Sequence, residues 1–362
     1  MVNFIFVGCD LHEETLVNRI AVGMGPSEQK TFSNRRAGRE KLIAYLKEKS
    51  EKLGGAPIVF AYEASGQGFG LYDQMTAAGI ECHVLAPTKM ESSVKDKRNK
   101  NDGRDAERIL KRVRAYKLAG EQLPSVWVPD LQTRDDRETV RSRQDLSDKL
   151  ASVKTQVRCL LQRHGIEKPA EVGKAGSKSH HHWLDQLGQD SSQGVGMRTA
   201  LGSLLRQVRY LEREIEQLDE AVDQLSRSPH RQAIVEALDR EAGVGRLTAT
   251  AYAVEIGDFT RFRRGRQVGA YWGITPSSDE SGEVNDRKGH ITRQGSPRIR
   301  KLLCQSTWYR VQKEAAVREV YRRLVSRNPK KKKIAVVACM RRLAIRLWHV
   351  GRQAQLAMQE VQ

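Results

Sequence analysis

The sequence predicts an α/β domain at the N-terminus, then a segment of long helices, then a mainly helical and strongly basic domain. Three observations in the 362 residues support this fold class. Short β-type runs alternate with helical patterns over roughly the first 90 residues, apolar residues spaced three and four apart follow, and positive charge gathers near the C-terminus. We expect three domains, spanning residues 1–125, 126–228 and 229–362.

The N-terminal elements predict a sheet that opens with three strands before its first helix. In chain order, the expected elements are strands Phe4–Val7, Val17–Val22 and one near Lys30–Phe32, helix Arg39–Lys49, strand Ile58–Tyr62, helix Leu71–Ala78 and strand Glu81–Leu85. In a Rossmann half each strand is followed at once by a helix. The order found here instead favours an α/β sheet that begins with a meander.

Four acidic residues are the candidate chemistry of this domain. Asp10 directly follows the first apolar strand and Glu63 the fourth, so the two can converge at one edge of the sheet. Asp102 and Asp105 lie at the start of a helical stretch, and their i, i+3 spacing places them on one helix face. Each acid alone also fits an ordinary turn or helix cap.

Together, four converging carboxylates would repel one another unless a divalent cation lay between them. Hard oxygen ligands without His or Cys predict Mg²⁺ or Mn²⁺ and, with it, phosphodiester chemistry. The sequence therefore predicts a metal site formed by Asp10, Glu63, Asp102 and Asp105.

Apolar residues at alternating steps of three and four predict two long helices with a coiled-coil seam in the middle segment. They run over Leu146–Leu160 and Leu201–Leu225, and the spacing leaves open whether they pack within one chain or join two chains. Between them, Glu171–Gly194 is rich in Gly, Ser, Lys and Gln and is expected to form a loop. Its three adjacent histidines, His180 to His182, point in different directions on any regular backbone and do not favour a metal site.

The charge of the chain predicts a polyanionic partner. The net charge is +19, and residues 261–352 hold 24 basic against 6 acidic residues, a local charge of +18. A turn with Gly243 and Gly245 between two helical patterns can present backbone amides to a phosphate, although it also fits an ordinary tight turn. The basic candidates for nucleic-acid contact are Arg261, Arg263, Arg264, Arg266, Arg293, Arg298, Arg300, Lys330, Lys331, Lys332 and Lys333.

The cysteines and the apolar runs of the sequence indicate in which cellular compartment the protein works. Five scattered cysteines without a CxxC spacing favour neither a disulfide framework nor a zinc site. The apolar runs are far shorter than the roughly 20 residues that span a bilayer. We therefore expect a cytoplasmic protein with no membrane partner.

Motifs along almost the whole chain resemble the DEDD insertion-sequence transposases, a family that includes Piv-like invertases. The N-terminal motifs are Gly8-Cys9-Asp10, Tyr62-Glu63-Ala64-Ser65-Gly66 and Asp102-x-x-Asp105-Ala106. The C-terminal motifs are Gly243-Val244-Gly245, Gly273-Ile274-Thr275-Pro276, Glu280-Ser281-Gly282 and Gly289-x-Ile291-x-x-x-Gly295. The resemblance implies a RuvC-like N-terminal domain with an RNase H fold and a C-terminal transposase domain with a helix-hairpin-helix-like turn.

The resemblance also implies how such a protein works. Members of this family are recombinases guided by a structured RNA, called bridge RNA or seekRNA, whose loops pair with donor and target double-stranded DNA. Ser281 would be the catalytic nucleophile, facing the acidic quartet of another subunit in a tetramer built as a dimer of dimers. From its residues alone, the segment around Ser281 is an ordinary polar turn.

Two other functions fit parts of the sequence. A RuvC-like structure-selective nuclease would use the same four acids with water as the nucleophile, but it would leave the motifs between Gly273 and Arg300 unexplained. A non-catalytic nucleic-acid-binding protein would use the basic helices, but it would have no need of an intact acidic quartet.

Overall fold

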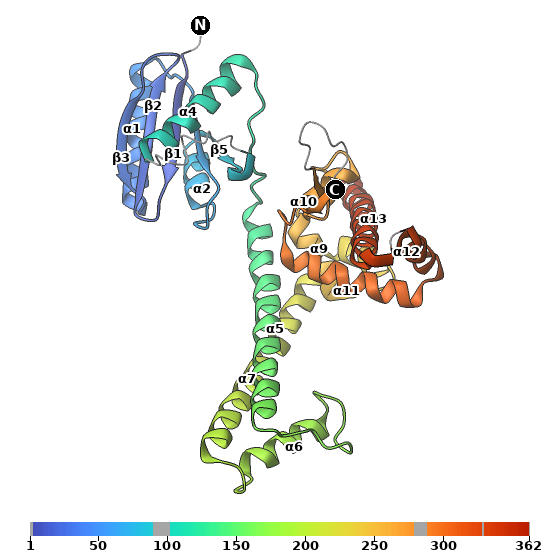
Figure 1. Ribbon diagram of the computed structural model, residues 1–362. Coiled ribbons are helices and arrows are strands. Elements are labelled where there is room, and N and C mark those ends of the chain that lie inside the picture. Colours follow the sequence, from blue (N-terminus) through green and yellow to red (C-terminus); the bar gives the residue numbers. More distant parts are fainter. Residues whose placement is uncertain (1–2, 90–101, 279–287, 328, 362) are drawn as a thin grey trace. The chain divides into compact units, whose positions relative to one another are not determined.

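The computed structural model describes residues 3–89, 102–278, 288–327 and 329–361. The chain divides into two compact units, residues 1–129 and 130–362 (Figure 1). Each unit has its own hydrophobic core and is described here by itself.

The first unit is built on a mixed five-stranded sheet. Its strands are β1 (Ile5–Leu11), β2 (Thr15–Val22), β3 (Glu28–Ser33), β4 (Ile58–Glu63) and β5 (Glu81–Leu85), in the spatial order β3-β2-β1-β4-β5. The first three strands pair antiparallel, and β4 and β5 run parallel to β1. The predicted opening meander is confirmed, and the domain is RNase H-like.

Helices cover both faces of this sheet (Figure 1). α1 (Arg36–Lys52) and α2 (Gly70–Ala77) pack on one face, and α4 (Asp102–Ala119) packs on the other. The short 3₁₀ helix η1 (Pro87–Lys89) follows β5. Because side chains alternate along a strand, Val7 and Cys9 of β1 share a core with α1 and α2, while Phe6 shares one with α4. By the same alternation Asp10 lies on the α4 face.

Gly8 lets α4 approach β1 closely. A Cβ at this position would lie 2.2 Å from the Ala106 carbonyl oxygen and 2.3 Å from the Leu110 nitrogen, both backbone atoms of α4. Only a residue without a side chain leaves room for that contact. The start of α4, which carries two of the predicted acids, is thereby held against the strand that carries Asp10.

We expect Gly8→Ala to destabilise the first unit by about 1–3 kcal/mol or more, because backbone atoms would have to move apart. The measurement is denaturant or thermal unfolding of the full chain. Gly66→Ala is the matched control, since a Cβ at Gly66 meets nothing within 4 Å. Equal stability of the two variants would show that α4 is not seated on Gly8.

The second unit is mainly helical, as predicted. In chain order it contains α5 (Leu131–Arg163), α6 (Lys178–Gln189), α7 (Val195–Ser226), α8 (Gln232–Asp239), α9 (Arg246–Ile256), α10 (Gly265–Tyr271), β6 (Pro276–Ser278), β7 (Lys288–Ile291), α11 (Pro297–Lys313), α12 (Ala315–Arg327), the 3₁₀ helix η2 (Pro329–Lys331) and α13 (Lys332–Val361). Among the helices in the described ranges, none is long and apolar enough to cross a membrane.

The two long helices of the middle segment, α5 and α7, pack on each other within the chain. Val153 of α5 meets Val208 and Leu211 of α7 in a small core. Nearer the C-terminal end of α5 and the N-terminal end of α7, Val157 forms a second core with Leu201 and Leu205. Over this stretch the apolar seam is therefore used inside the chain.

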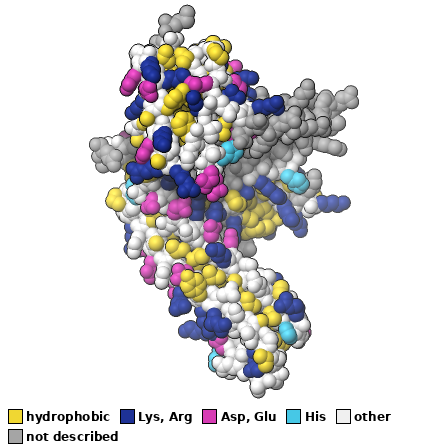
Figure 2. All heavy atoms as spheres, turned by 90° about the vertical axis from the view of Figure 1, so that its left-hand side faces the viewer, with side chains coloured by type: hydrophobic (Ala, Val, Ile, Leu, Met, Phe, Trp, Pro, Cys, Tyr) yellow, Lys and Arg dark blue, Asp and Glu magenta, His cyan; other side chains and the backbone are white. Residues whose placement is uncertain are grey.

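The prediction that Glu171–Gly194 is a loop was wrong for residues 178–189, which form α6. Ser177 caps this helix, its hydroxyl accepting a hydrogen bond from the His180 backbone nitrogen at 3.2 Å. Leu184 and Leu187 are buried against α5 and α7, which stabilises a segment whose composition alone favours a loop. At this end of the molecule, Figure 2 shows hydrophobic side chains exposed among Lys and Arg.

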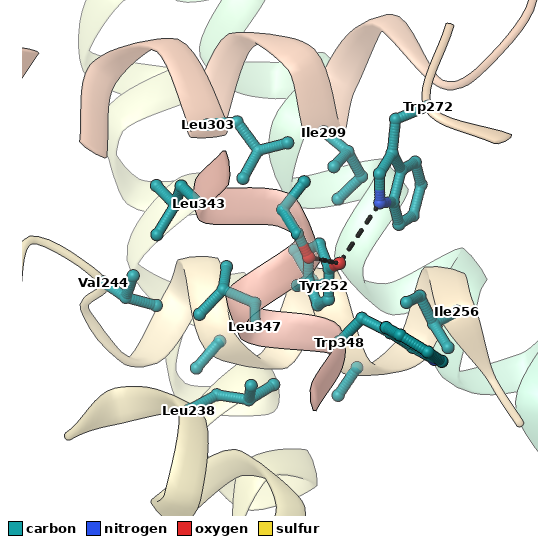
Figure 3. Close-up of a cluster of buried hydrophobic side chains, with 14 of the residues drawn as sticks. Leu238, Val244, Tyr252, Ile256, Trp272, Ile299, Leu303, Leu343, Leu347 and Trp348 are labelled. Atoms are coloured by element: carbon teal, nitrogen blue, oxygen red, sulfur yellow. Dashed lines mark hydrogen bonds between the residues drawn. The ribbon is translucent and has the colours of Figure 1, made fainter. Parts of the chain in front are cut away.

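The largest core of the second unit centres on Tyr252 of α9 (Figure 3). Its buried hydroxyl donates to the Ala344 carbonyl at 2.5 Å and accepts from Trp272 Nε1 at 3.3 Å. Trp348 Nε1 donates to the Phe259 carbonyl at 2.9 Å. These bonds satisfy the polar atoms of large buried rings, so α9, α10 and α13 form one packed body.

Candidate active site

Asp10 and Glu63 lie side by side at the carboxyl edge of the first unit's sheet. The parallel register of β1 and β4 pairs Cys9 with Tyr62, and each acid is the next residue of its strand. Their side chains are 19% and 29% exposed, so both are reachable from solvent but not freely hydrated. The predicted convergence of these two acids on one edge agrees with this placement.

Asp102 and Asp105 lie in the first turn of α4. The side chain of Asp105 is 21% exposed, whereas that of Asp102 is outside the described part of the structure. Arg108, one turn further along α4, reaches both Asp105 Oδ1 at 3.4 Å and Glu63 Oε1 at 2.8 Å through its Nη2. Glu63 and Asp105 thus meet on the same cationic nitrogen.

Asp10 contacts a histidine that directly follows β1 in the chain. His12 Nε2 lies 3.1 Å from Asp10 Oδ2. The chain after β1 is fixed by Asn34, whose buried amide donates to the His12 carbonyl and to Gln67 Oε1, each at 2.6 Å. The loop that follows Glu63 is therefore tied to the end of β1.

The donor set fits a hard divalent cation. Asp10, Glu63 and Asp105 offer carboxylate oxygens at one edge, and a single cationic atom already contacts two of them. Burial raises the pKa of the Cys9 thiol well above its usual range, and Asp10 raises it further, so Cys9 stays a neutral thiol and supplies no soft ligand. Across the residues with described side chains, no three acids, histidines or cysteines are already gathered as a metal cluster.

Ser281 lies outside the described residues, but the elements on either side of it are described. β6 and β7 pair antiparallel, with Pro276 opposite Ile291. Two glycines fix the base of this hairpin. A Cβ on Gly295 would lie 2.0 Å from the Tyr271 carbonyl oxygen, and Gly273 has a φ of +64° and packs on the backbone of Arg293.

The turn with Gly243 and Gly245 lies at the N-terminus of α9. Gly243 adopts a φ of +73°, a conformation that favours glycine, and Gly245 is the N-cap residue, without a side-chain cap. The turn lines a surface pocket of about 530 Å³ together with Ser306 and Tyr309. Tyr309 is 51% exposed, so an aromatic ring stands beside backbone amides at this pocket.

The basic candidates divide into two groups. Three have partners within the protein: Arg298 pairs with Asp145 at 2.6 Å, Arg300 donates to the Gly295 carbonyl at 2.6 Å, and the Arg261 guanidinium stacks on Phe262. The side chains of others are exposed, namely those of Arg263, Arg264, Arg266, Arg293, Lys330, Lys332 and Lys333. The side chain of Lys331 is outside the described part.

Arg108, His12 and Asn34 were missed by the sequence analysis. Arg108 carried a signal, because it follows Asp105 by three residues and so shares its helix face. His12 follows Asp10 by two residues. Nothing in the sequence indicated Asn34, because the two groups to which its amide donates, on His12 and Gln67, are distant from it in the sequence.

Comparison with known proteins finds matches to transposases in both units of the chain. Residues 7–166 match the family model for the DEDD transposase of IS110, and residues 235–322 match the one described as transposase, IS116/IS110/IS902 family. In Sinorhizobium fredii, the protein y4qE is 29% identical over 82% of this chain and 76% of its own length. The transposase for insertion sequence element IS1533 of Leptospira borgpetersenii is 25% identical over 84% of each chain. The chain therefore belongs to the IS116/IS110/IS902 family of transposases, enzymes that cleave and join DNA strands, and has a DEDD domain at its N-terminus.

Proposed function

We propose that this transposase is an RNA-guided recombinase that joins donor and target DNA through a covalent phosphoserine. The observation that carries the catalytic part is the meeting of Glu63 and Asp105 beside Asp10 at one sheet edge. The membership of a DNA-joining family gives the site its substrate class. The remaining steps follow from the chemistry of the residues.

Asp10, Glu63, Asp102 and Asp105 would hold Mg²⁺ or Mn²⁺, which orients the scissile phosphate and stabilises the charge that develops on it. Ser281 Oγ attacks the phosphorus, so that an Oγ–P bond forms and one P–O bond to a deoxyribose breaks. The released sugar oxygen takes a proton. In the rejoining step a sugar hydroxyl of the exchanged strand attacks the phosphoserine and frees Ser281. One phosphoester bond is exchanged for another, so no ATP is needed.

The nucleic acid would be held by two kinds of contact. The amides after Gly243 and Gly245 suit a backbone phosphate, and the exposed Tyr309 beside them offers a ring for a sugar or base. The exposed arginines and lysines supply affinity without sequence selection. This distribution fits a protein in which base pairing with a guide RNA, and not the protein surface, reads the target.

Guidance by RNA predicts a specific change in target choice. If the loops of the copurifying RNA select DNA, altered loop bases will redirect insertion to DNA that matches them, because pairing sets the sequence and the protein supplies the chemistry. The measurement is sequencing of insertion junctions produced by the full protein with wild-type and altered RNA. Insertion that stays at the original sites with altered loops would contradict guidance and would require a protein element that reads bases.

The same proposal includes assembly of the chain into a dimer of dimers, with Ser281 of one subunit acting beside the acids of another. The inner seam of α5 and α7 is buried within the chain at Val153, Val208 and Leu211. Contacts between subunits would therefore not use these three side chains. Light scattering of the protein with its RNA and DNA tests the assembly.

A further inference from the structure

Arg108 lies where a cation between two of the acids would lie. Its Nη2 is 2.8 Å from Glu63 Oε1 and 3.4 Å from Asp105 Oδ1. We propose that Arg108 occupies the acidic site until DNA arrives, and that a DNA phosphate then draws its guanidinium away, so that metal binding is coupled to DNA binding. This inference rests on the proposed metal site at the acids.

The backbone places Arg108 at this position. Glu63 ends β4, and Asp105 precedes Arg108 by three residues on α4, so the helix puts both charges on one face. The close contact of α4 with Gly8 fixes the height of the helix over the sheet. The guanidinium can therefore reach across from its own helix to the strand end.

The contacts of Arg108 differ from those of a structural ion pair in the same protein. Arg141 binds the buried Glu255 with two nitrogens, at 2.7 and 2.9 Å, and matches both carboxylate oxygens. Arg108 shares one nitrogen between two carboxylates, and its buried Nε has no hydrogen-bond partner among the described residues. The Arg108 guanidinium thus makes fewer hydrogen bonds than it could. This lowers the free energy needed to move it away from the two carboxylates.

The chemistry of the groups supports an exchange. A guanidinium binds phosphate oxygens in the same forked geometry as carboxylate oxygens, and the Arg108 side chain is 25% exposed. When it pairs with a phosphate, Glu63 and Asp105 lose their shared counter-charge. Two neighbouring carboxylates without a counter-charge attract a divalent cation more strongly than two that share one. Arriving DNA would therefore raise the affinity of the site for metal.

The test measures Mn²⁺ binding by the full-length protein, followed by electron paramagnetic resonance of free Mn²⁺, with and without a short DNA duplex. We expect Arg108→Gln to bind Mn²⁺ on the order of tenfold more tightly than wild type without DNA, since it removes a charge-assisted contact to the ligands. DNA should tighten Mn²⁺ binding by the wild type and change it little in Arg108→Gln.

Arg112→Gln is the matched control, because it removes the same charge from the same helix at a residue whose ion pair, at 3.9 Å, is with Glu121. It should bind Mn²⁺ as the wild type does. Arg108→Lys keeps the charge and should restore weak binding without DNA, which separates the charge from a general loosening of α4. Thermal unfolding checks that each variant is folded.

Glu63→Gln separates this inference from the proposed function on which it rests. If Mn²⁺ binding is lost in Glu63→Gln but not gained in Arg108→Gln, the acids form the site and the role of Arg108 is wrong. If Glu63→Gln binds Mn²⁺ as the wild type does, the proposed acid site is itself wrong, and the coupling with it. If Arg108→Gln and Arg112→Gln raise the affinity for Mn²⁺ equally, the cause is the lower net charge of the protein. That result would also overturn the proposal.

Discussion

Replacing Asp10 by Asn, Glu63 by Gln or Asp105 by Asn is expected to abolish strand cleavage. Each change keeps the shape of the side chain and removes the charge that a divalent cation needs. The loss should reach at least about a hundredfold, the scale seen when one group that stabilises transition-state charge is removed. The measurement is cleavage of a recombination-site duplex by the full protein with Mg²⁺ and its copurifying RNA.

These variants should still fold and bind RNA, because the three acids are partly exposed and lie outside the hydrophobic cores of the unit. Glu40→Gln is a suitable control, since its carboxylate lies on α1 and pairs only with exposed Arg36 among the described residues. Excess chelator should have the same effect as the substitutions. Full activity in chelator, or in Asp10→Asn, would show that the acids do not bind a catalytic metal.

The sheet could be predicted from the sequence because its strands are marked locally. Ile58–Glu63 has a continuous buried run from Val59 to Tyr62, which is typical of a strand covered on both faces. The positions of Asp10 and Glu63 then followed from the ends of two such runs. β1 runs to Leu11, past its predicted end at Val7, so Asp10 lies within its strand and not after it, and Glu63 is the last residue of β4. The edge that carries both acids is still the predicted one, because the two strands are parallel and their apolar runs were recognised.

The contacts at this edge could not be predicted in the same way. The bridge from Arg108 to Glu63 depends on how α4 lies over the sheet, which is set by the absence of a side chain at Gly8. Asn34 joins His12 and Gln67, which are 22 and 33 residues away in the sequence. The α6 helix was missed for a related reason, since Leu184 and Leu187 gain their stability from α5 and α7 and not from local propensity.

The second large effect is expected from Ser281→Ala, which should lower recombination on the order of a thousandfold or more and remove any protein-linked DNA strand. Denaturing gels with end-labelled DNA detect that strand in the wild type. Ser277→Ala is the matched control, because it also removes a serine hydroxyl from this segment. The Ser277 hydroxyl donates to the His290 carbonyl at 3.0 Å. The control should keep the covalent product.

A site shared between two subunits predicts that inactive variants can complement each other. If Ser281 of one subunit acts beside the acids of another, inactive Ser281→Ala and inactive Asp10→Asn should partly restore activity when mixed, since a mixed assembly contains some sites with both groups intact. Two defects in one subunit's own site would not complement each other. Asp10 belongs to the first unit of the chain, and residue 281 falls within the range of the second. A wild-type rate in Ser281→Ala would instead assign the attack to water and make the protein a metal-dependent nuclease.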